Sequence, residues 1–232
     1  MDFTGITYGF DQPIQHIIQG SDSLFLDRVI FTMTHTGTWV PLYVFLLLMV
    51  IKNNQTMKQI GLLLFMAIIS VVFADVIIDD IVKPLCMRYR PTRDPYLMYS
   101  IDVVNNYRAG SYGFFSAHAA NTMSVAVFFT LVVRNRIFGV VMILWSLLIG
   151  YTRIYLGVHY PSDVLTGWVW GLLIAVSTYF IYCYLYKKVS PERHYISTHY
   201  TETGYSLVDV YSVIQVIAAT LLYSCIRAMF SI

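Results

Sequence analysis

Three short strings of reactive residues stand out in an otherwise apolar chain. They are Lys83-x6-Arg90-Pro91, Phe115-Ser116-Ala117-His118 and Thr152-Arg153-x5-His159-x3-Asp163. Together they supply three cations, a hydroxyl group and two histidines, and one histidine has a carboxylate four residues later. These groups are what a site needs to hold a phosphate dianion and attack its phosphorus. Because the strings lie at the ends of very apolar segments, they predict a phosphate that belongs to a lipid.

His159 and Asp163 form the most reactive pair of the third string. An aspartate four residues after a histidine can accept the Nδ1–H, which leaves Nε2 free as a nucleophile. The run Tyr160-Pro161-Ser162 before Asp163 is typical of a turn that opens a helix. The alternative is a metal pair, since the two side chains could share a cation. The surrounding polar groups are mostly cations, which favour a phosphate over a metal ion.

The second string stands just before an apolar segment. Ser116 can cap the helix that follows, and the unpaired N–H groups of such a helix start suit an anion. His118 falls in the first turn of that helix, so its imidazole can face the same anion. An isolated histidine near a helix start usually has no such role. The neighbouring strings favour one for His118.

The first string offers two cations for phosphate oxygens. Arginine binds them through a bidentate fork and lysine as a compact charge, although both also bind lipid headgroups in general. Pro84 is expected to end the helix soon after Lys83. Asp75, Asp79 and Lys83 are spaced by four and should share one helix face. We expect Asp79 or Asp80 to hold Lys83 or a nearby arginine, with a purely structural ion pair as the alternative.

Composition places these strings in a membrane protein. Of 232 residues, 57% are hydrophobic and 12% are charged, about half the charged fraction of a soluble domain. The net charge of +2 gives no indication of nucleic-acid binding, and the three cysteines form no disulfide or metal pattern. We predict one domain over 1–232 with a catalytic core at about 36–186. Its fold would be an all-α polytopic bundle with an interfacial segment over the first 23 residues and six transmembrane helices, at 37–52, 57–82, 118–134, 137–156, 164–186 and 207–230.

Loop charges predict the orientation. Three alternate loops carry the basic residues Lys52, Lys58, Arg134, Arg136, Lys187, Lys188 and Arg193. The positive-inside rule makes that face cytoplasmic, so the termini and the loops that carry the strings face outward. Arg88, Arg93 and Arg108 are further outward cations. They would hold a second phosphate or contact anionic lipids.

The three strings resemble the signature of the type 2 phosphatidic acid phosphatase superfamily, in particular its integral-membrane lipid phosphatases. That signature reads Lys-x6-Arg-Pro, Pro-Ser-Gly-His and Ser-Arg-x5-His-x3-Asp. The resemblance implies that His159 becomes a phosphohistidine, that Asp163 orients it and that His118 protonates the leaving oxygen. It implies phosphate binding by Lys83, Arg90, Ser116, Ala117 and Arg153. Phe115, Ala117 and Thr152 replace the proline, glycine and first serine of the family pattern.

The expected function is therefore a metal-independent lipid phosphatase without a cofactor or an obligatory protein partner. Its substrate would be undecaprenyl pyrophosphate, phosphatidylglycerophosphate, phosphatidic acid or a phosphate of lipid A. In a bacterium, the site would face the periplasm from the inner membrane. One alternative is a phosphotransferase that passes the phosphate to a lipid or sugar acceptor. A second is a non-enzymatic transporter or scaffold, because charges within spans also mark ion paths.

Overall fold

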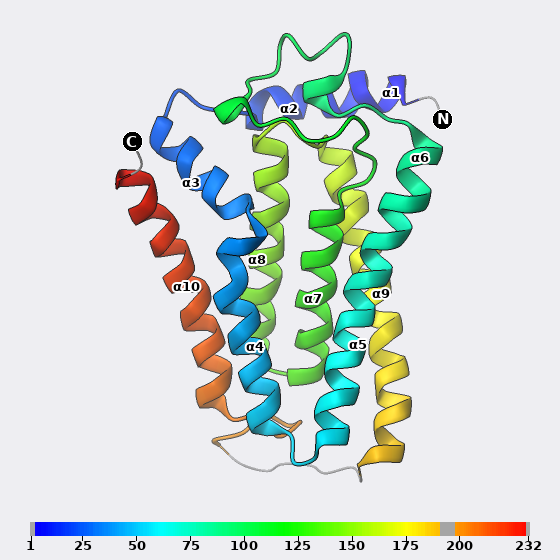
Figure 1. The fold of residues 1–232 in the computed structure, drawn as a ribbon, viewed down its shortest axis with the longest axis vertical. Helices are drawn as coiled ribbons and strands as arrows, with labels where there is room; N and C mark the ends of the chain where they lie inside the picture. The colour runs from blue at the N-terminus through cyan, green and yellow to red at the C-terminus, as the bar shows by residue number, and fades with distance from the viewer. Residues whose placement is uncertain (1–2, 191–197, 231–232) are drawn as a thin grey trace.

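The computed structural model describes residues 3–190 and 198–230, and the described chain is a bundle of helices (Figure 1). This confirms the predicted all-α membrane bundle. Its outer layer begins with α1 (Thr4–Ile6), η1 (Thr7–Asp11), α2 (Gln12–Ile18) and α3 (Leu24–Thr34). The bundle itself consists of η2 (Thr36–Trp39), α4 (Val40–Asn53), α5 (Met57–Val76), η3 (Ile77–Val82), α6 (Lys83–Cys86), α7 (Ala117–Val133), α8 (Arg136–Tyr155), α9 (Pro161–Val189) and α10 (Leu207–Phe230).

Among the described residues, five helical segments are long and apolar enough to cross a membrane: Thr36–Asn53, Met57–Cys86, Arg136–Tyr155, Pro161–Val189 and Leu207–Phe230. The sixth predicted span is α7, a shorter apolar helix of 17 residues. Most of its side chains are buried, and it lies in the middle of the bundle in Figure 1. A helix enclosed by its neighbours does not need the full length of a lipid-facing span.

Glycines bring α7 and α9 into close contact. A Cβ atom added to Gly167 would lie 2.6 Å from the carbonyl oxygen of Ser116, and one added to Gly171 would lie 2.3 Å from that of Ala120. Small residues four apart let two membrane helices approach at backbone distance. The contact also places the start of α7 against the start of α9, where the N–H of Ser116 donates to the carbonyl of Asp163 at 3.0 Å.

The N-terminal segment crosses the outer end of the bundle (Figure 1). The prediction of an interfacial segment captures its position but not its packing, because Thr7, Asp11 and Gln15 are buried in the protein. Gln15 Nε2 donates to the carbonyl of Ile154 at 2.8 Å. The stretch 24–36 does not prolong the first span as one helix, since α3 ends at Thr34 and His35 has an extended backbone.

The helix that carries Lys83 continues past it. Its predicted end at Pro84 is wrong by two residues, because α6 runs to Cys86 and Met87 ends it in the left-handed conformation with φ +48°. Pro84 lies in the first turn after the wider π-helical turn η3, where its missing N–H is tolerated.

The ends of α4, α7 and α9 that carry the basic residues lie together at the end of the bundle opposite α1 and α2, which we call the inner end (Figure 1). The basic loops follow α4, α7 and α9, as the loop pattern predicts. Lys52 pairs there with Asp209 at 2.7 Å, and Arg134 donates to the hydroxyl of Tyr179 at 3.0 Å. Arg193 lies outside the described residues.

Candidate active site

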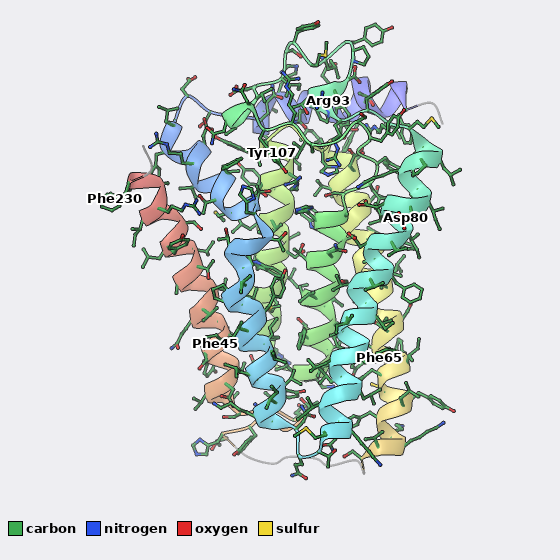
Figure 2. The ribbon with its side chains drawn as sticks, in the orientation of Figure 1. Phe45, Phe65, Asp80, Arg93, Tyr107 and Phe230 are labelled. Carbon is green, nitrogen blue, oxygen red and sulfur yellow. The ribbon has the colours of Figure 1, made fainter. Side chains whose placement is uncertain are left out.

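The three strings meet at the outer end of the bundle. His159 lies in the loop between α8 and α9, Ser116 precedes α7, and Arg90 follows α6. Their side chains are enclosed by protein: His159 is 1% exposed and Asp163 is fully buried. Figure 2 shows Tyr107 at this end of the bundle, with Arg93 in the loop above it.

Asp163 lies at the start of α9, as predicted, and its carboxylate caps that helix. Oδ2 accepts from the backbone N–H of Tyr160 at 3.0 Å. The same oxygen is 3.7 Å from Nδ1 of His159, which is longer than a hydrogen bond. The structure therefore brings the predicted pair together, while the expected Nδ1–H to carboxylate bond is not closed.

Arg90 lies against the other nitrogen of the imidazole. Its guanidinium donates to the carbonyls of Tyr112 and Val158, both at 3.0 Å, and its NH1 is 2.9 Å from His159 Nε2. Burial lowers the pKa of Arg90 to about 10, so the group stays cationic at neutral pH. Because a guanidinium can only donate, Nε2 must carry the lone pair and Nδ1 the proton. The lone pair of the imidazole therefore faces Arg90, and the Nδ1 proton faces the carboxylate.

The surroundings of His159 keep its ring neutral. Burial lowers the pKa of His159 well below its ordinary value, and the nearby positive charge of Arg90 acts in the same direction. Arg153, Lys83 and His118 add smaller contributions of the same sign. A neutral imidazole is the form of histidine that can act as a nucleophile.

The two remaining cations are held by different partners. Arg153, which is 2% exposed, donates to the hydroxyl of Thr34 at 2.6 Å and lies 5.8 Å from the ring of Tyr107. Lys83 forms the expected ion pair with Asp79. Both cations lie close enough to act electrostatically on His159.

The other two aspartates of this segment differ from Asp79. Asp75, predicted to share a helix face with this pair, accepts from Asn121 Nδ2 at 2.8 Å and so contacts α7. Asp80 is exposed at the edge of the bundle (Figure 2).

The start of α7 follows the sequence prediction. Ser116 Oγ caps the helix by accepting from the N–H of Ala119 at 3.4 Å, and both Ser116 and Ala117 are buried. His118 lies in the first turn of α7, half-buried, and lines a cavity of about 260 Å³. Thr34, Asn121 and Thr122 add polar groups to the wall of this cavity.

Among the three further arginines, Arg88 is buried, so the predicted contact with a second phosphate or with lipid headgroups is wrong for it. It is 5% exposed and donates to Asp163 Oδ1 at 2.5 Å, so it serves the protein interior. Arg93 and Arg108 stay exposed on the outer loop. Their contacts are with the carbonyls of Ala109 at 3.4 Å and Thr92 at 2.8 Å.

Sequence reasoning missed Gly113, whose backbone lies against Arg90, His159 and Asp163. A Cβ atom there would be 2.9 Å from Cγ of Arg90 and 3.4 Å from Oδ2 of Asp163. The available signal was a glycine between bulky aromatic residues just before the second string. Asp11 and Thr34 were missed too, because no motif links them to the three strings.

Comparison with known proteins identifies the family. The model of the PAP2 superfamily matches residues 59–190, so this chain belongs to the PAP2 superfamily. The predicted resemblance is thereby confirmed, and the relatives found are lipid phosphatases. The chain is 32% identical to a lipid A 4'-phosphatase of Bacteroides thetaiotaomicron, over 69% of this chain and 72% of the relative. It is 30% identical to a lipid A 4'-phosphatase of Porphyromonas gingivalis, over 72% and 70%.

A solved structure supports the fold. The crystal structure of a transmembrane PAP2-type phosphatidylglycerolphosphate phosphatase from Bacillus subtilis superimposes with a TM-score of 0.56. The match covers 81% of this chain and 89% of that chain at 22% identity. At this identity the likeness concerns the arrangement of the helices.

Proposed function

We propose that this protein hydrolyses the phosphate ester of a membrane lipid through a phosphohistidine at His159. One observation carries the proposal. Arg90 donates to Nε2 while the carboxylate of Asp163 lies next to Nδ1, so the imidazole presents a lone pair inside a cluster of cations. This is the arrangement that nucleophilic attack on a phosphate dianion requires.

The proposed reaction has two steps. In the first, the phosphate displaces the Arg90 guanidinium from Nε2, which attacks phosphorus as the bond to the lipid oxygen breaks. His118 gives its proton to the leaving oxygen. In the second step, His118 takes a proton from water, which attacks phosphorus and releases His159. As His159 becomes positively charged in these steps, Asp163 accepts a hydrogen bond from the Nδ1–H, as other orienting carboxylates do.

Fixed cations stabilise the charge on the phosphoryl group in this proposal. Arg90, Arg153 and Lys83 face the non-bridging oxygens from three elements. The hydroxyl of Ser116 and the backbone N–H of Ala117, at the start of α7, complete the pocket. Such donors act strongly in a buried, preorganised site. The reaction as proposed draws on no metal ion.

The path from His118 into the membrane supports a lipid substrate. Three residues of the cavity beside His118, namely Tyr43, Val71 and Val125, also line a second cavity of about 320 Å³. The second cavity is apolar and lies between α4, α5 and α7. Leu47 and Ile68 on its wall are 40% and 62% exposed, so it opens on the lipid-facing side. An acyl chain placed there would leave its phosphate near His118.

The relatives favour lipid A as the first substrate to test, since two of them are lipid A 4'-phosphatases. Lipid A carries several acyl chains and a phosphorylated sugar. Arg93 and Arg108, exposed on the outer loop, are free of the catalytic pair and suit a second phosphate. The basic loops at the opposite end favour an outward-facing site, which in a bacterium is the periplasmic side of the inner membrane.

Phosphate release by the detergent-purified protein tests this proposal. Lipid A, phosphatidylglycerophosphate, phosphatidic acid and undecaprenyl pyrophosphate would be compared in excess EDTA, with His159→Ala as the control. We expect wild-type protein to release phosphate from at least one lipid and the variant to release none. Equal release by a folded His159→Ala variant, or complete loss of wild-type release in EDTA, would contradict the mechanism.

A further inference from the structure

Arg88 joins the catalytic carboxylate to the N-terminal segment of the chain. The segment 3–18 lies outside residues 59–190, the part that matches the family model. Arg88 NH1 donates to Asp163 Oδ1 and its NH2 donates to Asp11 Oδ2, both at 2.5 Å. A single guanidinium therefore bridges two carboxylates from opposite ends of the sequence, and all three groups are buried.

Both terminal nitrogens of Arg88 are fixed by hydrogen bonds. Its NH2 also donates to the hydroxyl of Thr7 at 2.9 Å, and its NH1 to that of Ser162 at 2.7 Å. Its guanidinium carbon lies 4.4 Å from the ring centre of Tyr160 and 5.0 Å from that of Phe3. A planar guanidinium held by four oxygens and two rings has little freedom to move.

Asp11 also holds the first turn of α9, where Asp163 lies. Its Oδ1 accepts from the backbone N–H of Ser162 at 2.8 Å, and its Oδ2 from the hydroxyl of Ser162 at 2.7 Å. A carboxylate at a helix start is stabilised by the N–H groups that have no partner within the helix. Asp11 thus contacts the residue before Asp163 as well as the arginine that binds Asp163.

These contacts decide which way the Asp163 carboxylate faces. Arg88 occupies Oδ1, so Oδ2 is the oxygen left to face Nδ1 of His159 at 3.7 Å. Without Asp11, the positive charge of Arg88 would be balanced by Asp163 alone. Arg88 would then compete more strongly with the Nδ1 proton for that carboxylate.

We propose that Asp11 is a positioning residue for the His159–Asp163 pair, acting through Arg88, and that the N-terminal segment is part of the active site. The inference rests on the proposed function, because it assigns Asp163 the task of orienting His159. It predicts that kcat depends on Asp11 although Asp11 touches neither His159 nor the phosphate pocket.

The first test compares Asp11→Asn with Asp22→Asn. Asp22 is an exposed aspartate of the same N-terminal region and provides the matched control. We expect Asp11→Asn to lower kcat by about 10²-fold with little change in KM, the size of effect that a small misplacement of catalytic groups produces. Asp22→Asn should match wild type. If Asp11→Asn keeps wild-type kcat, or raises KM alone, the inference is wrong.

A double variant separates positioning from general stability. If Asp11 acts only through Asp163, adding Asp11→Asn to Asp163→Asn should lower kcat less than about threefold further, because residues that act as a unit are not additive. Losses that multiply in the double variant would instead indicate an independent structural role. Thr7→Val provides a milder probe if Asp11→Asn does not fold. It removes one hydroxyl from Arg88, and we expect a several-fold lower kcat; an unchanged kcat would contradict the inference.

The wild-type protein distinguishes this inference from the proposed function. Lipid phosphate hydrolysis by wild type, absent in His159→Ala, would uphold the proposed function by itself. An active wild type with an unaffected Asp11→Asn variant overturns the inference alone. A wild type that is inactive on every lipid phosphate overturns both.

Discussion

The two ends of the bundle both carry ion pairs, but in opposite surroundings. At the inner end, Lys52 pairs with Asp209 while 64% of the lysine side chain stays exposed. At the outer end, Arg88 pairs with Asp11 and Asp163 while only 4% of the arginine side chain is exposed. An exposed pair contributes little to stability, whereas removal of one partner from a buried pair leaves an uncompensated charge. The comparison indicates that the buried charges, which are costly, lie at the candidate site, while Lys52, one of the basic residues that predict the orientation, stays in solvent.

The largest effect expected from this comparison is at Asp163. Asp163→Asn removes the negative charge beside the Nδ1 proton and allows the imidazole to turn. We expect kcat to fall by about 10⁴-fold, the loss seen when an orienting carboxylate of a catalytic triad is made neutral. Steady-state turnover of the best lipid substrate measures it. A loss below tenfold in a folded variant would show that Asp163 serves the helix start of α9 alone.

Gly113→Ala tests how tightly the outer loop packs against the pair. Its new Cβ would be 2.9 Å from Cγ of Arg90, which must then move away from Nε2. We expect kcat to be about tenfold lower. We also expect the free energy of unfolding to decrease by about 1–3 kcal/mol, the usual cost of overpacking. Gly110→Ala is the control, because a Cβ there meets no atom within 4 Å. Equal activity in both variants would show that the loop yields without moving Arg90.

Val125→Trp tests the proposed path of the acyl chain. Val125 lines both cavities, so a larger side chain should block the passage between them. We expect kcat/KM to fall at least about tenfold for a long-chain lipid phosphate, while a short-chain soluble analogue keeps its rate. Leu144→Trp, on an exposed position of α8, is the control. An equal loss for both substrates would place the chain elsewhere.

The pH dependence of stability should report the neutral ring of His159 at the outer end. Because the folded state lowers the pKa of His159 well below 6.5, an unfolded chain binds more protons than the folded one in mild acid. The contribution of His159 to stability is therefore constant above about pH 6.5 and decreases as the pH falls below it. Unfolding in detergent should show less acid destabilisation in His159→Gln than in wild type. Identical pH curves would mean that the ring is not held neutral.

The smallest effect is expected at the inner end. Lys52→Ala removes an exposed pair, so we expect unchanged kcat and a change in unfolding free energy below about 1 kcal/mol. Thermal unfolding and turnover of the same sample measure both. A large loss of activity would show that the two ends are coupled, which the comparison of their ion pairs does not suggest.

Local signals made much of this architecture predictable. Apolar length gave the spans, and the cap of Ser116 and the turn before Asp163 are decided by neighbours within one helical turn. The sequence did not predict contacts between residues that lie far apart along the chain. The bond between Asn121 and Asp75 joins two helices, and a spacing rule within one helix does not report it. The contact of Arg88 with Asp11 joins residues 77 positions apart, and no spacing rule reports such a pairing.

Trapping the phosphorylated enzyme tests the central claim most directly. Wild-type protein would be mixed with a lipid substrate carrying radiolabelled phosphate, in a single turnover, and quenched in alkali, which preserves phosphohistidine. We expect transient label on the peptide that contains His159, and none in His159→Ala. Release of labelled phosphate without any labelled enzyme, or label on a different residue, would contradict the account.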